Sequence, residues 1–248
     1  MLKYWALNDG YLDVKQRELF GEGVEDIKFR LPIHSFLIKT EDQLILVDTG
    51  CGKYFGPTAG HIAKGLAAIG YKPEQITMVL LTHLHPDHIG GLPLFSNATI
   101  CISDIELEYW LNERGNVSEY NLKYIPFVNE MLTLIEGDIL LFKPNEILFP
   151  GITPIEAYGH TPGHSAFLFD AKDQKILFWG DLIHNVELQF LHPGRFVIID
   201  DNPEAAAITR LHLLKRSLDE NLLVGGAHLP GTGVGHVKNK SGFFEFIS

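Results

Sequence analysis

The chain has 248 residues, 46% of them hydrophobic and 21% charged, and its formal net charge of −11 argues against nucleic acid as a partner. Its two cysteines, Cys51 and Cys101, form no CxxC pair, so we expect reduced thiols and no disulfide framework. No linker divides the chain, which predicts a single domain over residues 1–248. No stretch approaches the roughly 20 apolar residues that cross a bilayer, and we find no secretory signal, so we expect a cytoplasmic location and no membrane contact.

Strand-like apolar runs alternate with turns in the first part of the chain. We expect strands at residues 4–7, 36–39, 44–47, 78–81 and 98–102. Apolar residues at helical spacing predict a helix over residues 61–69, which ends at Gly70. Further helices are expected to begin at residues 89–91 and to cover residues 104–112.

The middle of the chain is less regular. Residues 113–136 are rich in Tyr and Phe, and they either cover a site or form an extra surface element. Residues 139–179 again read as strands and tight turns, with a hairpin loop at residues 171–174.

The last part begins with a helix signal. Asn202 and Pro203 predict a capped helix start, and the helix covers residues 205–218 before a strand at residues 222–224. The chain therefore has two β-rich halves that each close with helices. This order fits an α+β architecture, an αββα sandwich of two sheets flanked by helices.

Residues 83–88, which read HLHPDH, carry the strongest functional signal. They place three imidazoles and one carboxylate directly after a buried strand. Ligands that alternate at a strand end can converge on one point, and the neighbouring Asp87 and His88 can turn toward a second. This pattern favours one divalent metal ion, or two side by side. The alternative is a polar turn whose histidines bond to backbone groups, but the density of such side chains argues for metal.

The motif HLHPDHIGG resembles the H-x-H-x-D-H signature of the metallo-β-lactamase-fold hydrolases. Four other segments resemble further motifs of that family and occur in the family's order: residues 44–50 (LILVDTG), 159–164 (GHTPGH), 178–181 (FWGD) and 226–231 (GAHLPG). Three segments are similar to the methyl parathion hydrolase and quorum-quenching lactonase branch: FGPT at 55–58, GHTPGHS from 159, and AHLPGTGVGHV from 227. The resemblance implies an αββα metallo-β-lactamase sandwich with a metal site at the edge of its sheets.

The resemblance also implies a ligand set for two divalent metal ions, with Zn²⁺ expected and Mn²⁺, Fe²⁺ or Co²⁺ as alternatives. It assigns His83, His85 and His160 to the first ion. It assigns Asp87, His88 and His228 to the second, and Asp181 as the carboxylate that bridges both. Each ion would keep an open position, the mark of a catalytic site. The expected nucleophile is a metal-bound hydroxide, and Asp87 would move a proton to the leaving group.

Several residues keep two interpretations. His160 and His164 compete for one ligand position; the family pattern favours His160 and leaves His164 as a supporting or plain turn histidine. His184 either faces the substrate oxygen, where related lactonases have a Tyr, or is a loop histidine bonded to backbone. Asp48 resembles a residue that supports the site without binding metal, and it also suits a cap of its own turn. Candidates for an apolar pocket are Tyr120, Phe190, Leu191 and Phe196.

The leading hypothesis is therefore a dinuclear metal-dependent hydrolase of a small ester, lactone or phosphotriester. The alternatives are a thioester hydrolase of the glyoxalase II type and a metal-binding protein without turnover. The only partner expected is a small-molecule substrate, and a homodimer through residues 113–136 is left open.

Overall fold

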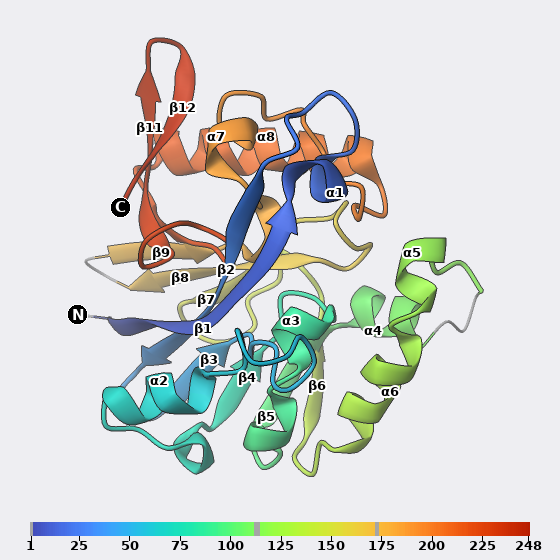
Figure 1. Cartoon of the computed structure of the whole chain (residues 1–248). Helices are drawn as coiled ribbons and strands as arrows, with labels where there is room; N and C mark the ends of the chain where they lie inside the picture. Colours follow the sequence, from blue (N-terminus) through green and yellow to red (C-terminus); the bar gives the residue numbers. More distant parts are fainter. Residues whose placement is uncertain (1, 112–114, 172–173) are drawn as a thin grey trace.

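The computed structural model describes residues 2–111, 115–171 and 174–248 and contains two six-stranded sheets packed against each other (Figure 1). The first sheet has the strand order β1-β2-β3-β4-β5-β6. Its strands are β1 (Lys3–Lys15), β2 (Lys28–Lys39), β3 (Leu44–Val47), β4 (Met78–Leu80), β5 (Thr99–Ser103) and β6 (Ile139–Phe142). β1, β2 and β3 pair antiparallel, whereas β3, β4, β5 and β6 pair parallel.

The second sheet has the order β12-β11-β10-β9-β8-β7. Its strands are β7 (Ile152–Glu156), β8 (Ser165–Ala171), β9 (Gln174–Phe178), β10 (Leu223–Gly225), β11 (Val234–Lys240) and β12 (Phe243–Ile247). Only β9 and β10 pair parallel among these neighbours. Each sheet therefore has parallel strands in its middle, and the carboxyl ends of those strands share one edge.

Helices lie outside the two sheets and along their shared edge. They are α1 (Gln16–Phe20), α2 (Ile62–Ala68), α3 (Pro86–Ile89), α4 (Asp104–Trp110), α5 (Glu119–Leu122), α6 (Ile125–Thr133), α7 (Val186–Gln189) and α8 (Pro203–Asp219). In Figure 1, α2 to α6 lie on the side of the first sheet, and α7 and α8 lie on the side of the second. The predicted αββα sandwich is confirmed. Within the described residues, no helix has the length and apolarity needed to cross a membrane.

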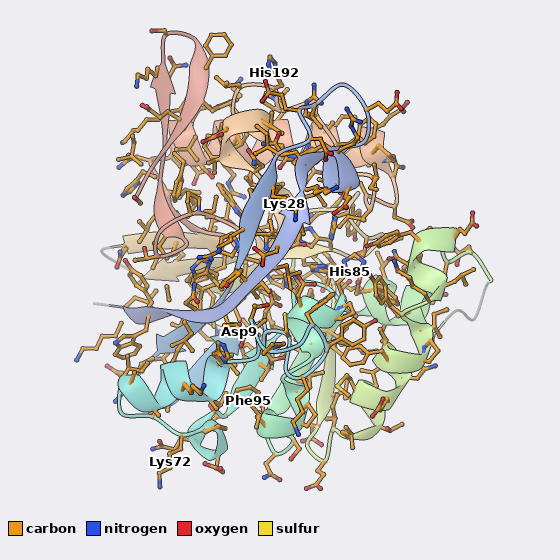
Figure 2. The ribbon with its side chains drawn as sticks, in the orientation of Figure 1. Asp9, Lys28, Lys72, His85, Phe95 and His192 are labelled. Carbon is orange, nitrogen blue, oxygen red and sulfur yellow. The ribbon has the colours of Figure 1, made fainter. Side chains whose placement is uncertain are left out.

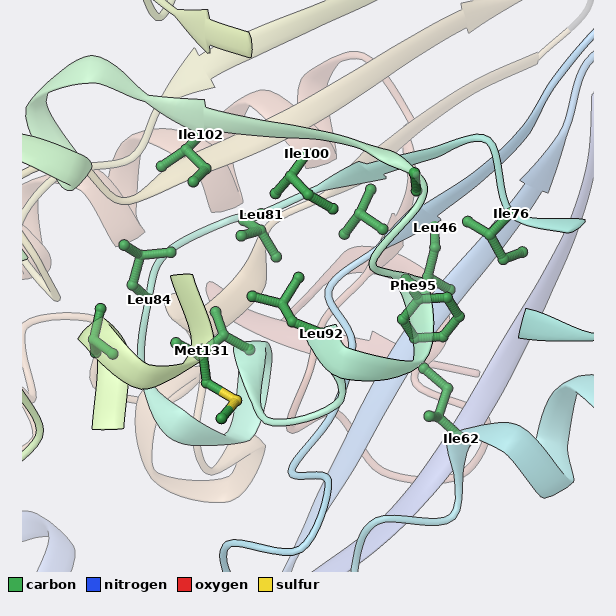
Figure 3. Close-up of a cluster of buried hydrophobic side chains, with 14 of the residues drawn as sticks. Leu46, Ile62, Ile76, Leu81, Leu84, Leu92, Phe95, Ile100, Ile102 and Met131 are labelled. Carbon is green, nitrogen blue, oxygen red and sulfur yellow. The ribbon is translucent and has the colours of Figure 1, made fainter. Parts of the chain in front are cut away.

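Three layers of apolar side chains hold the sandwich together. Between the sheets, the rings of Phe36 and Phe178 lie 4.7 Å apart at the centre of a buried cluster. The outer face of the first sheet packs against α2 and α6 through residues that include Leu46, Ile62, Phe95, Ile100 and Met131 (Figure 3). The outer face of the second sheet packs against Leu213 and Leu214 of α8. Burial of these side chains is the main favourable contribution to folding.

Several elements differ from the sequence-based expectation, and the strand expected at residues 36–39 is the end of the longer β2. The strand expected at residues 4–7 is the start of the longer β1, because it pairs with β2 over its whole length. The helix expected from residues 89–91 begins earlier, at Pro86, because His85 is extended and a proline suits the first helical turn. The segment 113–136 contains α5 and α6. The expected helix end at Asn112 and the hairpin loop tip at 172–173 lie outside the described residues.

The predicted ligand segments all follow strands at the shared edge. Residues 83–88 follow β4, Asp181 follows β9 and His228 follows β10, while His160 lies in the connection between β7 and β8. Because parallel strands present their carboxyl ends on the same side, segments far apart in the sequence meet there.

Candidate metal centre

Two groups of ligand-type atoms lie side by side at this edge. His83, His85, His160 and Asp181 form one group, and Asp87, His88, Asp181 and His228 form the other. Within each group the ligand atoms all lie within 4.8 Å of one another. Asp181 belongs to both groups, and it is only 3% exposed. These are the seven residues that the sequence analysis named as ligands, and the fold brings them together.

The inner nitrogens of the first group approach one another closely. His85 Nδ1 lies 2.9 Å from His83 Nε2 and 3.0 Å from His160 Nε2. Across the shared carboxylate, Asp181 Oδ1 lies 2.9 Å from His88 Nε2, and Asp181 Oδ2 lies 3.2 Å from His228 Nε2. Asp87 Oδ2 is 3.5 Å from His228 Nε2. Figure 2 shows His85 in the interior, on the side of the molecule where α4 to α6 lie.

The outer nitrogen of each of these five imidazoles bonds to a group that accepts its proton. The bonds join His88 Nδ1 to Asp48 at 2.8 Å, His160 Nδ1 to Asp200 at 2.9 Å, His85 Nε2 to Asn121 at 2.9 Å, His228 Nδ1 to the Pro32 carbonyl at 2.7 Å, and His83 Nδ1 to the Thr82 hydroxyl at 3.1 Å. The Thr82 hydroxyl in turn donates to Asp48, 2.8 Å away. A neutral imidazole has one N–H, so outward donation leaves a lone pair on the inner nitrogen of each ring that is neutral.

This arrangement tests whether the residues fit metal ions. His83 and His85 are both neutral, so the lone pairs of His83 Nε2 and His85 Nδ1, 2.9 Å apart, repel each other unless a cation lies between them. His88 Nε2 and Asp181 Oδ1 are also buried without a hydrogen-bond partner. Imidazole and carboxylate ligands, with the outer nitrogens held by other protein groups, are the donor set of divalent transition metals and zinc. The residues therefore fit two divalent ions that share Asp181.

Electrostatics agree with a cation site. Burial lowers the pKa of His83 and His85 well below the ordinary histidine range, so both are neutral. Burial alone would raise the pKa of Asp181, but the charges of His228 and His88 hold it well below its usual value. Asp181 is therefore ionised and can serve as the shared anion.

An apolar cavity of about 190 Å³ ends on this centre. Its walls are Leu12, Val14, Leu19, Leu31, Phe55, Tyr120, Tyr124 and Ile199, and its floor includes His85, Asp87, Asp181, His184 and His228. Tyr120 was a predicted pocket residue, whereas Phe190, Leu191 and Phe196 do not line this cavity. A larger groove of about 660 Å³ between β1 and β11 touches none of the predicted ligands.

His184 lies at the boundary between centre and cavity. Its Nε2 is 3.2 Å from Asp181 Oδ2, its ring stacks on His228 at 5.1 Å, and it belongs to neither ligand group. Both its ring nitrogens are buried without a hydrogen bond. Burial lowers the pKa of His184 to about 4, so the ring is neutral. His164 also lies outside the groups: it donates to the Ala157 carbonyl and accepts from the Asp181 backbone N–H.

The sequence analysis did not identify several residues that form hydrogen bonds to the ligands or to their loops. Glu106 of α4 is 1% exposed. Its carboxylate accepts from Leu84 N at 3.0 Å in the HLHPDH loop, and from the Thr161 hydroxyl at 2.6 Å and Gly163 N at 3.0 Å in the loop of His160. Glu106 therefore joins the two loops. No motif marks it, nor does any mark Asp200 or Asn121, because only the fold brings them to the site.

The chain is similar to known lactonases in sequence and structure. An N-acyl homoserine lactonase of a Bacillus species is 29% identical over 201 residues, which covers 73% of this chain and 75% of that protein. A second, from Bacillus cereus, is 32% identical over 161 residues, 57% of this chain and 60% of that protein. The solved structure of AidC, a dizinc quorum-quenching lactonase in complex with a product, N-hexanoyl-L-homoserine, matches with a TM-score of 0.90 at 29% identity, covering 99% of this chain and 94% of that one.

A family model covers most of the chain. The model of the metallo-beta-lactamase superfamily matches residues 29–228, which contain every residue of both ligand groups. The two-sheet sandwich, the shared edge and the His/Asp groups agree with that match. The chain therefore belongs to the metallo-beta-lactamase superfamily, and it is a metal-dependent hydrolase.

Proposed function

We propose that this protein hydrolyses lactones that carry an apolar acyl chain, of the N-acyl homoserine lactone class, at a centre of two zinc ions. The observation that supports this most directly is the apolar cavity that ends on both ligand groups. Such a cavity suits a substrate with an apolar tail and a hydrolysable polar head. The names of the relatives and of the similar dizinc structure point to the same substrate class.

We assign His83, His85 and His160 to one ion, Asp87, His88 and His228 to the other, and Asp181 to both. When bound, the two ions supply a nucleophile from water at neutral pH and polarise the carbonyl group of the substrate. The protein orients the imidazoles through their outer hydrogen bonds, and its apolar walls exclude bulk water from the reacting bond.

Asp87 and His184 are the residues we assign to substrate chemistry. Asp87 lines the cavity, and its side chain is 13% exposed, more than that of Asp181. It is therefore placed to take up a proton from the attacking water and pass it to the leaving alcohol. His184 is neutral and has unsatisfied ring nitrogens at the cavity floor. It is positioned to donate a hydrogen bond to an oxygen of the substrate.

The experiment is a matched panel on purified, zinc-loaded protein: N-hexanoyl homoserine lactone, an aryl phosphotriester, an aryl ester and a glutathione thioester. Each substrate is run with a chelator control and with the Asp181→Ala variant. We expect metal-dependent turnover to be highest on the lactone. Higher turnover of the phosphotriester or the thioester would replace the lactone assignment. Bound zinc without turnover of any of the four would contradict it and favour a role without catalysis.

A further inference from the structure

His85 is held differently from the other histidines of the centre. It faces the group with Nδ1, whereas His83, His88, His160 and His228 face it with Nε2. The outer nitrogen of His85, Nε2, lies 2.9 Å from Asn121 Oδ1. Free imidazole can carry its proton on either nitrogen, so some group must select the form that leaves Nδ1 bare. An amide oxygen only accepts hydrogen bonds, and it selects the Nε2–H form.

The orientation of Asn121 is itself determined by a second residue. Its Nδ2 donates to the Tyr109 hydroxyl at 3.0 Å, and that hydroxyl donates its only proton to Asp201 Oδ1 at 2.7 Å. Tyr109 can therefore only accept from Asn121. An Asn121 side chain turned by 180° would put its oxygen against the Tyr109 oxygen and its NH₂ against His85 Nε2–H. The hydrogen bonds thus run in one direction, from His85 through Asn121 and Tyr109 to Asp201.

This path ends at Asp201, next to Asp200, which is the hydrogen-bond partner of another ligand, His160. Asp200 accepts from His160 Nδ1 at 2.9 Å, and the backbone N–H of Asp201 donates to the His160 carbonyl at 3.1 Å. Two ligands of the same group therefore depend on one two-residue segment, His160 directly and His85 through Asn121 and Tyr109. Asn121 is fully buried and comes from α5, inside the segment 113–136.

We propose that Asn121 and Tyr109 are positioning residues that keep His85 in its Nε2–H form and thereby set the metal affinity of the His83/His85/His160 position. The other position, at Asp87, His88 and His228, has no bond to this path among the described residues. The inference depends on the metal centre alone, and it holds whatever the substrate is.

The test measures zinc affinity on the full-length protein by competition with a chromophoric chelator, without substrate. In Asn121→Leu, which keeps the volume but removes the acceptor, we expect the affinity of one of the two ions to fall about 10- to 100-fold, as is usual when an outer partner of a ligand is lost. The affinity of the other ion should stay unchanged. Asn121→Asp keeps an acceptor for His85 but places its second oxygen against the Tyr109 oxygen, so it should restore only part of the loss.

A second readout follows the proton itself. In the zinc-loaded protein, the His85 Nε2–H should give a slowly exchanging imidazole proton signal in NMR spectra, and Asn121→Leu should lose it. Tyr109→Phe should speed its exchange and weaken the same ion less. If the two residues act in one path, adding Tyr109→Phe to Asn121→Leu should lower the affinity no further.

Tyr71→Phe is the matched control, because Tyr71 contacts Trp5 and Lys39, on no path to a ligand. Its zinc affinities should equal those of the unchanged protein. Folded Asn121→Leu or Tyr109→Phe protein that binds both ions with unchanged affinity and keeps the protected proton would overturn the proposal. If Asn121→Leu fails to fold, Tyr109→Phe decides alone, because it removes a single hydroxyl.

Discussion

At the scale of single residues, the centre depends on Asp181 more than on any other side chain. It is the one carboxylate that both ligand groups share, and four imidazoles lie within 3.3 Å of its oxygens. Without its negative charge, the two metal positions would have no shared anion to offset the repulsion between the two ions.

We therefore expect Asp181→Asn to bind fewer than two zinc ions and to lose at least about 100-fold in hydrolysis rate. Elemental analysis of the purified protein and lactone hydrolysis would measure the two effects. Asp170→Asn is the control, because Asp170 of β8 pairs with Lys175 at the surface and belongs to neither ligand group. Two tightly bound ions in Asp181→Asn would contradict the shared-ligand assignment.

Glu106 is the second residue on which the site depends, although it touches no ligand atom in the two groups. Burial raises its pKa, and four donors, from Leu84, Trp110, Thr161 and Gly163, favour its charged form. Glu106→Gln places an NH₂ group against donors, so at least one buried donor loses its partner.

For Glu106→Gln we expect a loss of about 1–3 kcal/mol in the free energy of unfolding, measured by urea denaturation of the metal-free protein. Glu130→Gln, on the exposed face of α6, should change it by less than about 0.5 kcal/mol. Equal stabilities of the two variants would show that the bonds of Glu106 contribute nothing to the fold.

At the scale of elements, the cavity is shaped by parts of the chain that contain no ligand. Leu12 and Val14 come from β1, Leu19 from α1 and Leu31 from β2, whereas Tyr120 and Tyr124 come from the segment around α5. These elements decide how long a substrate tail can be buried.

We expect kcat/KM for acyl homoserine lactones to rise with chain length until the cavity is filled. Each buried methylene contributes about 0.8 kcal/mol, which corresponds to roughly fourfold in kcat/KM. Val14→Phe should narrow the cavity and lower the rate for long chains more than for short ones. A chain-length profile that is flat, or that Val14→Phe leaves unchanged, would mean that the tail binds elsewhere.

At the scale of the whole molecule, metal binding and folding are linked. The ligand-type residues come from loops after β4, β9 and β10 and from the β7–β8 connection, so ions bound by them would join both sheets. An ion that binds the folded chain more tightly than the unfolded one stabilises it.

Chelation should therefore lower the melting temperature. Zinc at 100 times its dissociation constant contributes about 2.7 kcal/mol per site, and about 2–4 °C per kcal/mol is usual at this chain size. Thermal scans with and without chelator would measure the difference, and adding back zinc should reverse it. An unchanged melting temperature would mean that zinc binds the folded chain weakly, or no more tightly than it binds the unfolded chain. That residues 1–248 unfold as a single domain stays a prediction, and one cooperative transition would support it.

The sequence was enough to predict the architecture and the seven ligand-type residues. HLHPDH alone indicated a metal site, and the resemblance of the later His and Asp motifs, in their order, to one family implied the rest of the ligand set. The αββα layering could also be predicted, because two β-rich halves with flanking helices have few ways to bury their apolar faces.

The surroundings of the ligand-type residues could not be predicted from the sequence, because they form only when the chain folds. Glu106, Asn121 and Asp200 meet the centre through contacts between residues 22 to 57 positions apart in the chain, and nothing in their neighbours signals this. The cavity walls are likewise assembled from separate elements. A buried polar side chain can satisfy its hydrogen bonds with many different partners, so its partner depends on how the whole chain packs. A ligand motif such as HLHPDH can be recognised from neighbouring residues alone.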